Sequence, residues 1–212
     1  MSVLVVMDVD STLIQQEVIE LLADHAGLMP EVRAITELAM TGEIDFQESL
    51  TKRVKLLKGL PVDVFYEVRQ KISFTTGAPE LVEAVHALGG RIGAVSGGFS
   101  QILGGLAHEV GLDYWKANEL EVEDGELTGR LIGEMIDAQA KATALRQWAD
   151  DFGLDIADTV AIGDGANDIP MLQAAGLAVA FRPKQVLRQY ADIVIEENSL
   201  VPLIERLQLR SS

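Results

Sequence analysis

The chain has 212 residues, of which 48% are hydrophobic and 24% are charged, a balance typical of a soluble globular protein with one sizeable core. Its 33 Asp and Glu against 17 Lys and Arg give a formal net charge of −16, which argues against nucleic acid or an anionic membrane as the main partner. Cysteine is absent, so disulfides and thiolate metal sites are excluded. Because no pattern of a signal peptide or of a membrane span is found, we expect a cytoplasmic protein.

The first predicted element is a strand. Residues 3–7, VLVVM, form a continuous apolar run, which is typical of a strand buried on both faces of a sheet. Asp8 and Asp10 follow directly and would lie close together at the C-terminal end of this strand. Two like charges in that position repel each other and lose solvation, so they require a ligand or a chemical role that compensates for the cost.

A helical block is predicted next, over residues 14–73. Apolar positions recur there at helical spacing, glycine or proline stands at the expected ends, and no strand pattern interrupts them. The expected helices cover residues 14–27, 32–43 (ending at Gly42), 45–60 and 61–72. We interpret the block as a cap domain inserted into a core domain made of residues 1–13 and 74–212.

From Gly77 onward, helical and strand patterns alternate, which predicts a mostly parallel sheet with helices on both faces. The fold class is therefore α/β, with a Rossmann-like core and an inserted helical cap. A hairpin is expected where Asp124-Gly125 interrupts alternating residues. The other expected elements are strands at 91–98 and from 159, helices at 78–90, 99–111 and 138–153, and a strand, helix, strand, helix succession within 173–181, 184–196 and 200–209.

Acidic side chains gather where the predicted strands end. Asp8, Asp10, Asp164 and Asp168 would converge on the edge of the sheet where ligands bind in such folds. Oxygen ligands without cysteine or histidine suit a hard divalent cation, of which Mg²⁺ is the first candidate. Since Mg²⁺ usually takes only one or two protein carboxylates, at least one acid would be free for chemistry.

Three further segments have an ordinary and a functional interpretation. GDGAND (163–168) can be a simple turn, or its N–H groups can face an anion. SGG (96–98) can be a turn with a capping serine, or the Ser96 hydroxyl and the Gly97 N–H can cradle phosphate. Lys141 can be a surface lysine, or it can clamp phosphate and the Asp8 carboxylate.

Together the functional interpretations describe a phosphoryl-transfer site. Asp8 can attack phosphorus and form an aspartyl phosphate, which divides one difficult displacement into two easier ones. Asp10 can protonate the leaving oxygen and later take a proton from the attacking water. Mg²⁺, Lys141 and Ser96 would stabilise the charge that develops on the phosphoryl oxygens.

DVDST (8–12), SGG (96–98), Lys141 and GDGAND (163–168), in this order, resemble the four motifs of the haloacid dehalogenase superfamily. Over nearly the whole chain the resemblance is to its phosphatases that act on phosphoserine. It implies the aspartyl-phosphate mechanism, dependence on Mg²⁺ and a helical cap inserted after the first motif.

By position, the resemblance makes Asp8 the nucleophile and Asp10 the acid and base. Asp8, the Asp10 carbonyl and Asp164 would ligate Mg²⁺, Asp168 would support the bound waters, and Asn167 would lie near the phosphate.

The predicted cap also resembles this family, through Glu17 and the segment EIDF…SLTKR (43–53). Glu17 would meet the substrate ammonium, and Arg53 would hold the substrate carboxylate through a bidentate pair. Met40 and Phe46 would wall the small ligand. On local evidence alone, Arg53 could equally belong to a solvated helix face with its neighbouring lysines, and Glu17 could be an ordinary surface residue.

The expected function is hydrolysis of O-phospho-L-serine to L-serine and phosphate, the last step of serine biosynthesis, by a monomer or homodimer. One alternative is a related phosphatase or phosphotransferase that acts on another small phosphomonoester. A second is a signalling receiver module, which also phosphorylates an aspartate beside Mg²⁺. Chain length, the cap and Asp10 count against that second alternative.

Overall fold

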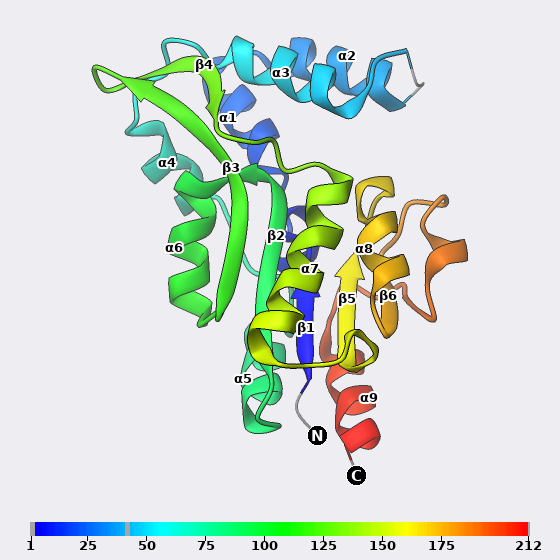
Figure 1. Cartoon of the computed structure of the whole chain (residues 1–212). Helices are drawn as coiled ribbons and strands as arrows, with labels where there is room; N and C mark the ends of the chain where they lie inside the picture. Colours follow the sequence, from blue (N-terminus) through cyan, green and yellow to red (C-terminus); the bar gives the residue numbers. More distant parts are fainter. Residues whose placement is uncertain (1–2, 41–42, 212) are drawn as a thin grey trace.

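The computed structural model describes residues 3–40 and 43–211, and its centre is a seven-stranded sheet of order β4-β3-β2-β1-β5-β6-β7 (Figure 1). All neighbouring strands are parallel except β3 and β4, which form an antiparallel hairpin. The predicted α/β class with a mostly parallel sheet is therefore confirmed. The strands are β1 Leu4–Met7, β2 Arg91–Phe99, β3 Tyr114–Glu123, β4 Glu126–Ile132, β5 Thr159–Gly163, β6 Leu177–Phe181 and β7 Ile193–Ile195.

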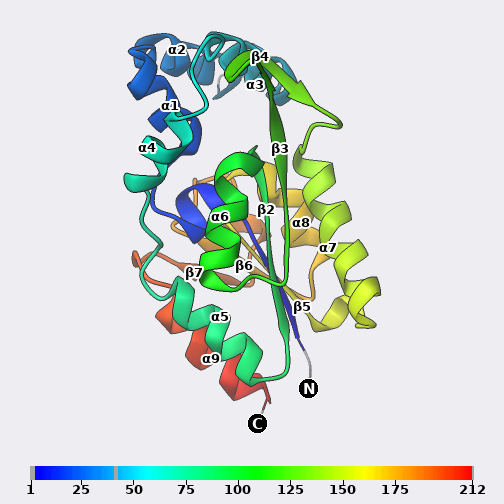
Figure 2. The ribbon, with the colours of Figure 1, turned by 90° about the vertical axis from the view of Figure 1, so that its left-hand side faces the viewer.

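Helices cover both faces of the sheet (Figure 2). On one face, α5, α6 and α9 pack over Val5 and Met7 of β1, and on the other, α7 and α8 pack over Leu4 and Val6. These four side chains are fully buried, as the continuous apolar run predicts for a central parallel strand. The helices are α1 Val18–Ala26, α2 Met29–Met40, α3 Phe46–Leu56, α4 Val64–Gln70, α5 Ala78–Ala87, α6 Ser100–Val110, α7 Ala138–Phe152, α8 Ile169–Ala174 and α9 Val201–Ser211.

The helical block formed by α1–α4 follows β1, and α1–α3 lie beyond the C-terminal ends of the central strands (Figure 1). The chain enters and leaves the block side by side, because Ile14 and Phe74 form an antiparallel bridge and the Gln15 N–H donates to the Ser73 carbonyl. Ile14 is thus extended, and α1 begins four residues later than the periodicity predicts. The predicted stop of the second helix at Gly42 lies outside the described residues.

The hairpin turn at Asp124-Gly125 is confirmed, with φ of 50° and 82° at these two residues. The tip of the hairpin contacts the linker between α3 and α4, a contact that the sequence did not reveal. Gly59 N–H donates to the Leu127 carbonyl, and Leu127 N–H donates to the Leu60 carbonyl. Main-chain hydrogen bonds therefore fasten the helical block to the end of the β3–β4 hairpin.

The helix predicted within residues 184–196, ahead of β7, is wrong, because the segment forms only a short 3₁₀ turn at Arg188–Tyr190. Parallel strands β6 and β7 require the connection 182–192 to run back along the whole strand length. The first residues of this connection are also held at the C-terminal end of the sheet. The Arg182 N–H donates to the Ile195 carbonyl, and the Lys184 N–H donates to the Asp164 carbonyl. Too few residues remain for a helix, which rises only about 1.5 Å per residue.

Among the described residues, no helix combines the length and the apolar character that crossing a membrane requires.

Gly176, just before β6, packs closely against the backbone of Ala157, which precedes β5. A Cβ at this position would lie 2.0 Å from the Ala157 carbonyl oxygen, which is backbone and cannot rotate away. We expect Gly176→Ala to lower the free energy of unfolding by about 2–3 kcal/mol, as overpacking does. Chemical denaturation followed by circular dichroism measures this change.

The matched control is Gly105→Ala in α6, where nothing lies within 4 Å of the added methyl group. This variant should gain about 0.5–1 kcal/mol from the better helix propensity of alanine. Equal effects of the two substitutions would contradict the packing described for Gly176.

Candidate active site

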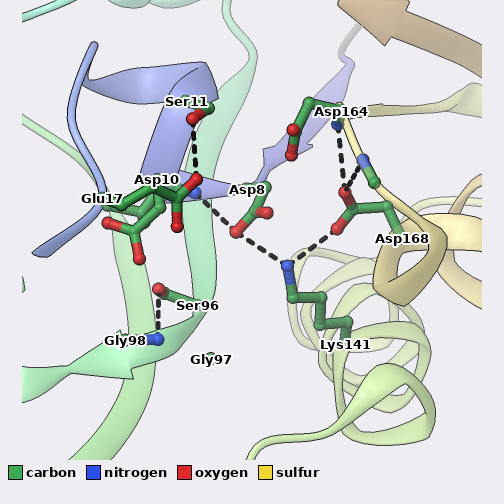
Figure 3. A network of polar contacts seen from close by, with 12 residues as sticks. Asp8, Asp10, Ser11, Glu17, Ser96, Gly97, Gly98, Lys141, Asp164 and Asp168 are labelled. Carbon is green, nitrogen blue, oxygen red and sulfur yellow. Dashed lines mark hydrogen bonds and ion pairs between the residues drawn. The ribbon is translucent and has the colours of Figure 1, made fainter. Parts of the chain in front are cut away.

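The site begins where β1 ends, at the buried Asp8 (Figure 3). Its Oδ1 accepts a hydrogen bond of 2.7 Å from the Val9 N–H and forms a 2.7 Å ion pair with Lys141 Nζ. The following turn, Val9–Leu13, redirects the chain toward the helical block, with Ser11 in the left-handed region at φ 58°. One oxygen of Asp8 is thus fixed by two donors at the end of the strand.

Lys141 lies between two carboxylates of the core. Its Nζ is 2.7 Å from Asp8 Oδ1 and 2.7 Å from Asp168 Oδ1, and its side chain is 1% exposed. Helix α7 presents it from its first turn, which is capped by Asp137 accepting from the Ala140 N–H. Burial by itself lowers the pKa of Lys141, but the carboxylates of Asp168 and Asp8 raise it by more, so the ammonium is charged. The surface-lysine interpretation is therefore wrong.

The GDGAND segment forms a turn that is filled by its own last residue. Asp168 Oδ2 accepts hydrogen bonds of 3.0 Å from the N–H groups of Asp164 and Gly165 (Figure 3). Gly163 makes room for this carboxylate, because a Cβ there would lie 2.4 Å from Asp168 Cγ. These two N–H groups bind Asp168, so they do not face an external anion.

Asp8, Asp164 and Asp168 form a cluster that can hold a metal ion, with carboxylate oxygens within 4.8 Å of one another. Burial raises the pKa of Asp8 to about 7, with Asp168 and Asp164 adding to the rise and Lys141 opposing it. Burial likewise raises the pKa of Asp164 to about 6. Three carboxylates against one buried lysine leave an excess of negative charge, which a hard divalent cation would offset.

Asp10 lies next to this cluster, outside the group of three. Its Oδ1 accepts a 3.3 Å hydrogen bond from the Val18 N–H at the start of α1. Burial, followed by the charges of Glu17 and Asp8, raises the pKa of Asp10 well above its ordinary value. The two aspartates of the first motif therefore differ in environment, since Asp8 forms an ion pair with Lys141 whereas Asp10 accepts from a backbone N–H.

Strand β2 runs through the SGG segment, and its serine does not cap the following helix. The Ser96 hydroxyl oxygen accepts a 2.7 Å hydrogen bond from the Gly98 N–H. Sequence reasoning missed Asn118, whose buried amide donates to the Gly97 carbonyl and accepts from the Ile136 N–H, both at 2.8 Å. Asn118 thus holds the SGG backbone in place, and no motif around it marks this role.

A cleft of about 90 Å³ joins the strand ends to the helical block, so both parts contribute to one site. Most of the predicted site residues line it, including Glu17 and Arg53 from the block, whereas Ser96, Lys141 and Asp168 lie buried behind its wall. The side chain of Met40 lies outside the described residues. The lining residues are Asp8, Asp10, Glu17, Ile19, Phe46, Leu50, Arg53, Gly97, Gly98, Phe99, Asp164, Asn167 and Lys184.

The helical block contributes an acidic side chain, a positively charged side chain and an aromatic ring to the lining of the cleft. Glu17 Oε1 accepts a 2.7 Å hydrogen bond from the Ser11 hydroxyl, which ties it to the turn after β1. Arg53 is partly buried, and its Nε donates to the Ser49 carbonyl at 3.3 Å. Burial lowers the pKa of Arg53, and the charges of Glu17 and Asp10 oppose that change. Phe46 closes over Gly97, where an added Cβ would lie 3.1 Å from its ring.

Comparison with known proteins places the chain in a family. Residues 5–173 match the model of the haloacid dehalogenase-like hydrolases. A phosphoserine phosphatase of Streptococcus thermophilus is 50% identical over 204 residues, covering 96% of this chain and 95% of that protein. A phosphoserine phosphatase of Methanocaldococcus jannaschii is 42% identical, and the match covers 97% of this chain and 97% of that protein.

The solved structure of a substrate-bound phosphoserine phosphatase complex matches with a TM-score of 0.92 at 41% identity, over 97% of this chain and 98% of that one. The chain belongs to the phosphoserine phosphatase family of haloacid dehalogenase-like hydrolases. The predicted superfamily is thereby confirmed, and the receiver-module alternative is excluded.

The raised pKa values give the site a defined pH dependence. Without a cation, Asp8 and Asp164 in the folded protein keep protons that the same residues lose above pH ~4 in the unfolded chain. The free energy of unfolding therefore falls as the pH rises from ~4, up to about pH 7 for the contribution of Asp8 and about pH 6 for that of Asp164. We expect excess Mg²⁺ to raise Tm by about 5 °C or more at pH 7.5, and by less at pH 5, where protons compete.

Thermal denaturation with Mg²⁺ or with EDTA at matched ionic strength measures this difference at both pH values. In the Asp164→Asn variant, most of the increase in Tm caused by Mg²⁺ at pH 7.5 should be lost. If Mg²⁺ raised Tm by the same amount at pH 5 and at pH 7.5, the cation would not bind at this carboxylate cluster.

Proposed function

We propose that this chain is a Mg²⁺-dependent phosphatase that hydrolyses O-phospho-L-serine to L-serine and phosphate through an aspartyl phosphate on Asp8. The observation that carries the proposal is the shared cleft, in which Asp8 and Asp10 of the core face Glu17 and Arg53 of the helical block. A phosphoserine phosphatase structure described as a phospho-aspartyl intermediate analogue, with a TM-score of 0.91 at 41% identity, supports this chemistry. The proposal includes a role in serine biosynthesis, in the cytoplasm, as a monomer or homodimer.

The first step is attack by Asp8 on phosphorus. Because Asp8 Oδ1 is held by the Val9 N–H and Lys141, its other oxygen is the one available as the nucleophile. The phosphorus–oxygen bond to serine breaks as the new bond forms. Lys141, Ser96 and the Gly97 N–H would stabilise the charge on the phosphoryl oxygens, with Asn167 nearby.

Asp10 carries the protons. Its raised pKa favours a protonated carboxyl, which can donate a proton to the departing serine oxygen. The carboxylate that results can then take a proton from the water that attacks the aspartyl phosphate. This second displacement releases inorganic phosphate and returns both aspartates to their starting states.

The metal-binding residues would be Asp8, the Asp10 carbonyl and Asp164, with Asp168 supporting bound waters. Bound Mg²⁺ would offset the negative charge shared by the phosphate and the acids. The carboxylate cluster fits such an ion, because its donors are hard oxygens and one lysine does not balance their charge.

Recognition of the amino acid falls to the helical block, which we propose acts as a cap domain over residues 14–73. Glu17 would bind the ammonium of phosphoserine, and Arg53 would bind its carboxylate through two parallel hydrogen bonds. Phe46, and Met40 as the sequence predicts, would wall the ligand and exclude water, which strengthens the electrostatic interactions in the cleft.

Substitution of the two aspartates separates their roles. We expect Asp8→Asn to abolish phosphate release, since an amide does not form the acyl phosphate. Asp10→Asn should lower kcat by about 10²- to 10⁴-fold, the usual contribution of a general acid or base. Phosphate release and circular dichroism measure activity and folding. An Asp10→Asn protein with full activity would overturn the proton-carrying role.

Arg53→Ala tests the assignment of phosphoserine. We expect it to raise KM for phosphoserine by about 10- to 100-fold, because a charge-assisted hydrogen-bonded pair is lost. Turnover of phosphoethanolamine, which lacks the carboxylate, should change little.

The matched control is Lys52→Ala, which removes the neighbouring, exposed cation that pairs with Glu48 at 2.8 Å on the same helix. It should leave both substrates unaffected. A wild-type enzyme that handles phosphoethanolamine as well as phosphoserine would show that Arg53 does not recognise the carboxylate.

A further inference from the structure

The charge around the cleft is unfavourable for an anionic substrate. Four carboxylates line it, those of Asp8, Asp10, Glu17 and Asp164. Lys141 is buried behind them and is already shared between Asp8 and Asp168. A phosphate dianion approaching this site also meets a protein of formal net charge −16, so local positive charge at the entrance is needed.

Two cations line the cleft among the residues that the structure describes, and they lie on different parts of the chain. Arg53 belongs to α3 of the helical block, on the side where Glu17 lies. Lys184 follows β6 in the core and lines the cleft together with Asp164 and Asn167. Neither the four motifs nor the spacing of charges in the sequence singled out Lys184.

The backbone of Lys184 is fixed to the rim of the site, because its N–H donates a 2.8 Å hydrogen bond to the Asp164 carbonyl. Its side chain remains 62% exposed, and Nζ lies 3.6 Å from Asp164 Oδ2. This separation exceeds hydrogen-bond length, so the ammonium is attracted to Asp164 without being locked onto it.

Gly165 shows where the Lys184 ammonium points. A Cβ on this glycine would lie 2.7 Å from Asn167 Oδ1 and 3.6 Å from Lys184 Nζ, so both side chains extend over the same backbone position. Asn167 is the residue expected beside the phosphate. Arg182, a cation two residues earlier in this loop, does not line the cleft and donates to Asn198 Oδ1 at 3.1 Å instead.

We propose that Lys184 captures the phosphate group at the mouth of the cleft, binding phosphoserine as it enters and inorganic phosphate before it leaves. This inference rests on the proposed function for the identity of the substrate. A lysine suits the task because its ammonium is a point charge with three donors on a flexible stem, able to move from Asp164 to a phosphate oxygen. Arg53 would hold the opposite, carboxylate end of the substrate.

Lys184→Met tests the proposal, since it removes the charge and keeps a long, flexible side chain. We expect about a fivefold increase in the Kd of inorganic phosphate, measured by calorimetry with Mg²⁺ present, and a similar increase in KM for phosphoserine. The kcat value should stay within about twofold, inhibition by L-serine should not change, and Lys184→Arg should restore most of the phosphate affinity.

The matched control is Lys116→Met, which makes the same change in net charge at an exposed position of β3 in a separate surface groove. Its Kd for phosphate should equal that of the wild type. Raising the NaCl concentration should also weaken phosphate binding to the wild type more than to Lys184→Met, because salt screens an exposed charge.

Several outcomes would overturn the role of Lys184. An unchanged phosphate Kd in Lys184→Met would do so, and so would an equal loss in Lys116→Met, which would indicate a general field effect. A change confined to the Mg²⁺ requirement would show that Lys184 serves only Asp164. If the wild type did not hydrolyse phosphoserine, the proposed function would fail, while the phosphate titrations would still decide the role of Lys184.

Discussion

A buried lysine shared by two aspartates holds the active-site end of the sheet together. Lys141 comes from α7, Asp8 ends β1, and Asp168 precedes α8, so one ammonium joins three segments that are far apart in the sequence. Removing the lysine would leave two carboxylates without their cation in the interior, and an uncompensated buried charge typically costs about 3–5 kcal/mol. Asp168 extends the connection further, since its second oxygen holds the backbone of the turn after β5.

This arrangement separates a rigid part of the site from an adaptable one. Lys141, Asp8 and Asp168 are buried, and Lys141 and the Val9 N–H hold one oxygen of Asp8, which fixes the proposed nucleophile in one orientation. Asp10, Glu17 and Arg53 are more open and belong to, or contact, the helical block. In the proposed mechanism the nucleophile is therefore fixed at a strand end, while the residues proposed for recognition belong to a helical block that varies more easily without disturbing the core.

The sequence identified the parts of the site whose local pattern reflects their role. A continuous apolar run followed by acids predicted β1 and Asp8, and Asp124-Gly125 predicted the hairpin turn. Asn118 and Lys184 were not found, because their roles arise from contacts with residues distant along the chain. The helix expected near 184 was wrong because hydrogen bonds to other strands, invisible in local periodicity, determine the path of that connection.

The linker between α3 and α4 has a further consequence for the sheet itself. β4 is an edge strand, and its Leu127 N–H and carbonyl are both occupied by the linker, while Pro61 bridges the neighbouring Glu126. At the opposite edge, β7 spans only the three residues Ile193–Ile195. Exposed strand edges are templates for pairing with other chains, so covering one edge and shortening the other limits aggregation through the sheet.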